Sequence, residues 1–245
     1  MADVTHLSRA PIAEALVDIY VTLADSFDAS TLAEAQKELS PQYPIMVTQN
    51  QVEAMFALQQ DSPSATSSPP SLHGFFFRSA NEKRVVQFRR NGFTYNIINS
   101  YTSWDDMIAE AMRLWAVYAR YASPRTVNRL GVKYINNLVL QSGDNDLALL
   151  LTLPPRSPVG VSANINGMYW FTGLSINDAI QAGLTVSLQP TAGPTGALVI
   201  DVDVFRPTVF SPAEHDVATG FVGMRDVKNR LFFGAITDGL CSRYK

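Results

Sequence analysis

The order of secondary structure that the sequence predicts runs twice along the chain. Residues 11–122 predict a strand, a short helix, several strands and a long helix, and residues 130–240 predict the same order again. The two segments share almost no residue identity, so the similarity lies in the order of elements alone. We therefore expect one α+β domain over residues 1–245, with two similar halves, an antiparallel sheet and the long helices on one face of that sheet.

Alternation along the first strand indicates how the sheet is covered. In residues 12–23 the odd positions from Ala13 to Leu23 are apolar, whereas Glu14 and Asp18 lie at even positions. Successive side chains of a strand point to opposite faces. One face is therefore expected to pack against the core and the other to remain open.

A hairpin is the clearest local prediction. Two alternating runs flank Asn91-Gly92, a pair that favours a two-residue turn. The register expected from this turn pairs Arg90 with Phe93, Phe88 with Tyr95 and Val86 with Ile97. The face expected to be buried (the dry face) holds Val86, Phe88, Phe93, Tyr95 and Ile97. The face expected to be exposed to solvent holds Gln87, Arg89, Thr94 and Asn96.

Other elements follow from caps and turn residues. Ser103 is expected to cap a helix that ends near Ala122, and Ser211-Pro212-Ala213-Glu214 is expected to open one final long helix. Asp144 is expected to cap a short helix. Residues 61–71 are rich in Ser and Pro and predict a flexible loop. Further strands are expected near 47–59, 72–79, 131–140, 159–174, 183–190 and 197–206.

Composition restricts the possible partners. The formal net charge is -3 and the pI about 5.6, which gives no basic footprint for a nucleic acid backbone. The single cysteine, Cys241, cannot form an intrachain disulfide. The start of the chain shows no signal peptide, and Glu14 and Asp18 interrupt the apolar stretch that follows. We expect a cytoplasmic protein with no membrane partner.

Several stretches together resemble a known family. They are LSRAPIAEALVDI at 7–19, NIINSYTSWDDM at 96–107 and RLGVKYINNL at 129–138. The chain resembles a sporadically distributed, uncharacterised bacterial protein family of about 250 residues, over most of its length. Lys133 stands where that family tends to show Arg, which disfavours a bidentate partner at this position. The resemblance implies a bacterial, intracellular context and no particular activity.

Polar residues on the strand that opens the second half are the first candidate site. Lys133, Tyr134, Asn136 and Asn137 are unusually polar for a strand at the centre of a repeat. Buried amides need partners, so these residues either bridge the two halves or line a groove. In the second case Glu14 of the first strand is expected to join Lys133 and Asn136 in binding.

A pair of acidic residues is the second candidate. Asp201 and Asp203 point the same way from one strand, with Cα atoms roughly 6.6 Å apart, and could share a Mg²⁺. The alternative is a solvated strand face. No pattern of His, Cys or Gly predicts a catalytic residue, a metal centre or a cofactor. Aromatic and basic residues between Phe75 and Tyr95 suggest base stacking, but the aromatic side chains fall on the dry face.

The leading interpretation is a binding protein without enzymatic activity. We expect it to recognise a protein or peptide through the exposed polar face of the sheet, and unpaired sheet edges make a homo-oligomer possible. One alternative is a small-molecule pocket between helices and sheet, with walls from Trp104, Trp115, Tyr134 and Trp170. Another is a metal-dependent phosphoesterase that uses Asp201 and Asp203.

Overall fold

A nine-stranded antiparallel sheet dominates the structure, and helices complete a mixed α+β fold. The computed structural model describes residues 6–52, 54–59, 62–67, 69–141, 143–144, 146–161, 165–189 and 196–245. The strands of the large sheet are β1 (Ile12–Thr22), β2 (Ile45–Gln51), β5 (Ser71–Arg78), β6 (Arg84–Arg89), β7 (Gly92–Ile98), β8 (Thr126–Val139), β9 (Met168–Ser175), β10 (Gln181–Gln189) and β11 (Ala197–Arg206).

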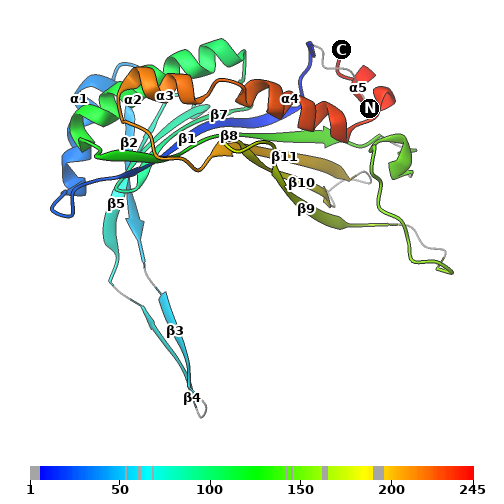
Figure 1. The fold of residues 1–245 in the computed structure, drawn as a ribbon, viewed down its shortest axis with the longest axis horizontal. Coiled ribbons are helices and arrows are strands. Elements are labelled where there is room, and N and C mark those ends of the chain that lie inside the picture. The colour runs from blue at the N-terminus through cyan, green and yellow to red at the C-terminus, as the bar shows by residue number, and fades with distance from the viewer. Residues whose placement is uncertain are drawn as a thin grey trace.

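The order of strands separates early from late segments. The sheet runs β2-β5-β6-β7-β1-β8-β11-β10-β9. Strands from residues 12–98 therefore occupy one side, strands from residues 126–206 occupy the other, and β1 pairs with β8 between them. Figure 1 shows this sheet as a curved layer, and Arg9 lies beside the C-terminal end, where its N–H donates to Tyr244 O at 3.1 Å.

Each central strand has a buried side and a polar side. Ala15, Val17 and Ile19 of β1 are fully buried, and Val17 lies opposite Val132 of β8. We call the side that carries these residues the core face. The opposite side, which carries Asp18 and Arg129, is called the polar face. The alternation in β1 confirms the pattern expected from the sequence.

Helices pack against strands next to the sheet centre. Helix α2 (Trp104–Ala122) begins after Ser103, whose hydroxyl accepts from the Asp106 backbone N–H at 3.1 Å, so the predicted cap is confirmed. It contacts β7 and the 3-10 helix η1 (Ala29–Ala35), which continues into α1 (Gln36–Leu39).

The final long helix is instead broken into two. α3 (Glu214–Gly220) contacts β8, and α4 (Met224–Ala235) contacts β11. Between them Gly223 adopts a φ of 84°, a left-handed conformation that interrupts the helix. A side chain at Gly220 would meet Leu130 at 2.2 Å, so this glycine allows the helix to lie close to β8. A short helix α5 (Asp238–Ser242) follows and buries Cys241.

The hairpin of β6 and β7 has the expected faces but a different register. Phe88 lies opposite Phe93 and Val86 opposite Tyr95, so the predicted pairing is wrong by two residues along β7. A shift of two residues keeps every side chain on its expected face. Arg90 and Asn91 form the two-residue turn, since Arg89 pairs with Gly92. Backbone hydrogen bonds hold the turn to neighbouring strands: Arg90 N donates to His73 O, and Val21 N donates to Asn91 O.

Three smaller expectations also need correction. Residues 62–67, expected within the loop 61–71, form strand β4 (Ser62–Ser67), which pairs with β3 (Ala54–Gln59) in a hairpin that projects from the sheet in Figure 1. Asp146 rather than Asp144 caps the short helix η2 (Leu147–Leu149), because Asp144 bonds instead to Gln141 and Arg243. The strand expected from residue 159 begins only at Met168.

Candidate functional site

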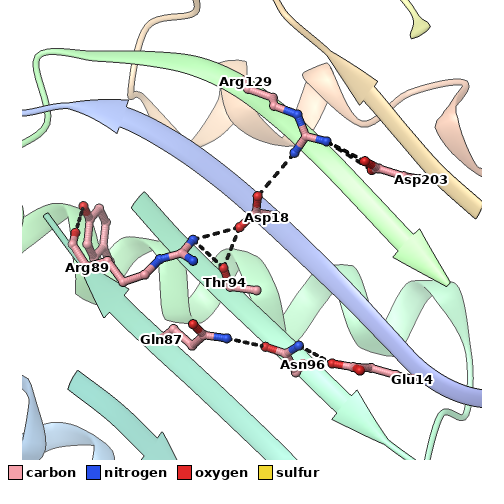
Figure 2. Close-up of polar contacts among 9 residues, drawn as sticks. Glu14, Asp18, Gln87, Arg89, Thr94, Asn96, Arg129 and Asp203 are labelled. Carbon is pink, nitrogen blue, oxygen red and sulfur yellow. Dashed lines mark hydrogen bonds and ion pairs between the residues drawn. The ribbon is translucent and has the colours of Figure 1, made fainter. Parts of the chain in front are cut away.

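Asp18 connects two arginines at the centre of the polar face. Its side chain is only 13% exposed. Asp18 Oδ1 lies 2.9 Å from Arg89 Nη2 and accepts from the Thr94 hydroxyl at 2.5 Å, while Asp18 Oδ2 lies 3.2 Å from Arg129 Nη1. These contacts join β6, β7, β1 and β8, as Figure 2 shows for Arg89, Thr94, Asp18 and Arg129. The carboxylate thus neutralises two bases that come from opposite sides of β1.

Arg129 is held flat against the sheet. Its Nη2 donates to both oxygens of Asp203, at 3.1 and 2.9 Å, and its guanidinium lies 4.5 Å from the centroid of the Phe205 ring. A side chain at Gly131 would come within 2.7 Å of this guanidinium. Gly131 therefore leaves the space that Arg129 occupies.

Lys133 and Asp201 form a second ion pair beside Arg129. Lys133 Nζ lies 2.9 Å from Asp201 Oδ2, and both side chains are partly exposed. Burial lowers the pKa of the Lys133 ammonium, but the hydrogen bond and charge of Asp201 outweigh it, so the pKa lies above its ordinary value. Burial raises the pKa of the Asp203 carboxyl despite the nearby Arg129.

Asp201 and Asp203 share the polar face, as their spacing indicated. Asp203 already binds Arg129 and Asp201 binds Lys133, so each carboxylate has a base as its partner. In the part of the chain that the structure describes, no group of three or more His, Cys, Asp or Glu side chains is placed to hold a metal ion. The arrangement is that of paired charges on a sheet surface.

The three predicted binding residues do not meet at one place. Glu14 lies on the polar face and accepts from the Asn96 amide, which in turn accepts from Gln87 at 3.2 Å (Figure 2). Lys133 lies on the same face. Asn136 points to the core face, is 4% exposed and donates to Ile200 O at 3.0 Å. Asn136 lines a cavity on the core face. It does not share a groove with Glu14 and Lys133, because strand residues an odd number of positions apart, such as Lys133 and Asn136, face opposite sides.

Two hollows mark the polar face. One, of about 300 Å³, is lined by Lys133, Asp201 and the rings of Phe171 and Phe205. Gly173 and Gly183 lie opposite each other in its floor. The other, of about 590 Å³, lies over Asp18 and its two arginines. Tyr169 and Phe171 lie on the edge strand β9 and are 75% and 59% exposed.

A larger cavity lies on the core face. It measures about 690 Å³ and is formed by α4, the end of β8 and residues 6–12 and 99–104. Trp104 and Tyr134, two of the expected pocket walls, line it. Trp115 is instead fully buried against Tyr118, and Trp170 lies on β9.

The residues that organise both sites escaped the sequence analysis. Arg129 could have been found from Gly131, since a glycine inside a strand often marks a close approach of another group. Lys228, which lines the cavity on the core face, has no signal in the sequence beyond its place in a helix. Its place in the cavity depends on Tyr134 of β8, which packs against it and is distant in sequence.

Comparison with known proteins gives no match: no protein-family model, curated protein or solved structure is similar to this chain. The family resemblance drawn from residues 7–19, 96–107 and 129–138 therefore stays a prediction. In the described residues, no helix is long and apolar enough to cross a membrane.

Proposed function

We propose that this protein binds a protein or peptide on the polar face of its sheet and acts by binding rather than by catalysis. The observation that carries the proposal is the ordered set of paired charges on β1, β8 and β11, next to exposed aromatic rings on β9. Exposed aromatic and arginine side chains are enriched at protein interfaces. Fixed charges supply the complementarity that selects a partner.

The same charges disfavour a nucleic acid as the partner. Arg129 is bound by Asp18 and Asp203, and Lys133 by Asp201. Binding to a phosphate backbone relies on bases that are free to replace counterions. On these strands each basic side chain lies beside a carboxylate, so the surface carries both signs of charge. Such a surface is complementary to a partner that also carries both signs, such as a polypeptide.

We further propose that the sheet consists of two similar halves, residues 11–122 and 130–240, with the long helices on one face. Strand order supports this, because β1 and β8 meet at the centre and β7 and β11 lie next to them. The helix contacts support it too, since α2 packs on β7 and α4 on β11. An experimental structure with helices on both faces, or with halves that do not superimpose, would contradict it.

A second copy of the chain is one possible protein partner. β2 and β9 are the two edge strands of the large sheet. On β2, Ile45, Met46 and Val47 are 37–41% exposed. Edge strands offer unpaired backbone groups to another strand, so pairing at β2 would give a homo-oligomer.

The alternative of a small-molecule-binding protein is favoured by the cavity on the core face. Its volume of about 690 Å³ and its aromatic walls suit a small organic ligand. The alternative of a metal-dependent phosphoesterase draws no support from the geometry, because Asp201 and Asp203 each bind a base.

Affinity purification with matched variants tests the proposal. The tagged protein, isolated from cells that express it naturally, is expected to retain a stoichiometric partner, and Tyr169→Ser and Phe171→Ser are expected to lose it. Val222→Ser is the control, because Val222 is 66% exposed between α3 and α4. Retention of the partner by both β9 variants would contradict binding on the polar face.

A further inference from the structure

The cavity on the core face combines aromatic walls with basic side chains. Trp104, Tyr134 and Phe232 supply rings, and Arg9, Arg225 and Lys228 supply positive charge. No aspartate or glutamate lines the cavity among the described residues. A cavity with this lining differs from the polar face, where Arg89, Arg129 and Lys133 each have a carboxylate partner.

Lys228 is the base that lies deepest without a counter-charge. Its Nζ lies 4.3 Å from the centroid of the Tyr134 ring, and in the described part of the chain it makes no ion pair. Arg225 has one acidic neighbour, Asp105, at 3.9 Å, and both of those side chains are largely exposed. Arg9 donates to a neutral acceptor, the Arg243 carbonyl, at 2.7 Å. Among the described residues, Lys228 and Arg9 therefore have no carboxylate that compensates their charge, and Arg225 has only a distant, exposed one.

A polar group next to these bases also lacks a partner. The Ser100 hydroxyl is buried, lines the cavity and has no hydrogen-bond partner among the residues that the structure describes. Buried polar groups in native proteins are nearly always satisfied, by protein, water or ligand. An unpaired hydroxyl and an unpaired ammonium in one cavity indicate a ligand that accepts hydrogen bonds.

The protonation of Lys228 agrees with this interpretation. Burial, assisted by Arg225, lowers its pKa to about 8. Tyr134 faces the ammonium, and the other titratable groups that line the cavity from other elements are Tyr101, His6 and Arg9. None of these supplies a fixed negative charge at neutral pH. The ammonium form therefore still predominates at neutral pH, and an anion in the cavity would stabilise it further.

We propose that this cavity binds a small organic anion, a carboxylate or phosphate group on an aromatic or apolar body, with Lys228 as the anchor for the charge. The cations and the Ser100 hydroxyl fit the anionic group, and the rings of Trp104 and Tyr134 fit the body. The inference rests on the small-molecule alternative above and is independent of the polar-face proposal.

Calorimetric titration of the full chain tests the inference with defined probes. Benzoate and phenyl phosphate carry the two anionic groups on the same ring, benzyl alcohol is the neutral match, and inorganic phosphate lacks the ring. We expect saturable binding of benzoate or phenyl phosphate, and the stronger of the two identifies the anionic group. Lys228→Met is expected to weaken this binding about tenfold or more, the usual value of a charge-assisted contact. The control is Arg230→Met, exposed on the same helix and outside the cavity lining, which should bind as the wild type does.

The outcomes separate this inference from the proposal on which it rests. Equal binding of benzyl alcohol and benzoate, or full binding by Lys228→Met, would overturn the anion site and leave a small-molecule pocket. Failure of all four probes to bind would overturn both. Neither result would affect the polar-face proposal, which is tested with other residues.

Discussion

Asp18 is the residue on which the charges of the polar face depend. It is the shared partner of Arg89 and Arg129, and both arginines are also less than a quarter exposed. Removing one partner from a largely buried ion pair leaves a charge that neither water nor protein compensates. Loss of Asp18 would leave Arg89 without its carboxylate partner, whereas Arg129 would keep Asp203.

We therefore expect Asp18→Asn to lower the free energy of unfolding by about 1–3 kcal/mol, below the cost for a fully buried pair because some solvent reaches this one. Glu82→Gln is the control, since it breaks an exposed ion pair with Arg78 and should cost about 0–1 kcal/mol. Urea denaturation measures both. Equal stability of the two variants would show that Asp18 does not organise the face.

Lys228 predicts a dependence of stability on pH. Its pKa is about 8 in the folded protein and 10.5 is its ordinary value. Between about pH 8 and pH 10.5, Lys228 is protonated in the unfolded chain but largely neutral in the folded protein. The free energy of unfolding of the wild type therefore rises with pH over this range. Lys228→Met lacks the effect. It should be the more stable protein near neutral pH, and its advantage should shrink between about pH 8 and pH 10.5.

Denaturation of both proteins across that range measures the difference, in which the other titrating groups largely cancel. A constant difference would mean that Lys228 keeps its ordinary pKa. The same experiment also shows that Lys228→Met folds, which the titration of anions requires.

At the scale of residues, the sequence predicts which side of a strand a residue takes but not what it contacts. Asp201 and Asp203 are two positions apart and share a face, as expected. Their partners, Arg129 and Lys133, come from β8, a strand some 70 residues earlier, and only the pairing of β8 with β11 brings them together. Lys133 and Asn136 face opposite sides, which their odd spacing already implies.

At the scale of elements, Gly92 fixes how β7 joins β1. Its φ is 156°, and a side chain there would lie 2.2 Å from the Ile19 carbonyl oxygen. The sequence indicates Gly92 as a turn residue, but the structure uses it as the point where two strands approach. This also explains the difference in register, since the approach of β1 determines where the hairpin closes.

Gly92→Ala is expected to destabilise the protein by about 2–4 kcal/mol, because the added methyl group must displace the backbone of β1. Gly167→Ala is the matched control, since the nearest atom to its added carbon lies 3.9 Å away. Thermal or chemical unfolding compares them. A Gly92→Ala protein as stable as the control would contradict the close approach of β7 and β1.

The helices show the same limit of sequence reasoning. The Ser103 cap is local, involves a backbone group three residues away and is predicted correctly. The break between α3 and α4 lies at Gly223, whose backbone is left-handed, whereas the close fit of Gly220 against Leu130 depends on the distance between α3 and β8, which no local pattern encodes. The caps predicted at Asp144 and Ser211 are wrong, because Asp146 caps η2 and α3 begins after Ala213 with no side-chain cap. A local pattern therefore predicts a cap only where packing between elements does not move the start of the helix.

At the scale of the whole molecule, the sheet carries paired charges on its polar face, and a cavity lined by basic side chains lies between its core face and α4. The antiparallel sheet and mixed α+β class were predicted from alternation and turns. The strand order was not, because the pairing of β1 with β8 joins segments more than a hundred residues apart. This central pairing places Asp18 and Arg129 in contact, so the polar face is a product of topology.

Site-specific photo-crosslinking in cells tests the binding role of the polar face most directly. A photoreactive phenylalanine replaces Tyr169 or Phe171 on β9, or Val222 between α3 and α4 as the control; all three are exposed. We predict a discrete cross-linked product with one polypeptide partner from positions 169 and 171 and none from position 222. Cross-links from position 222 alone, or from none of the three, would contradict the account.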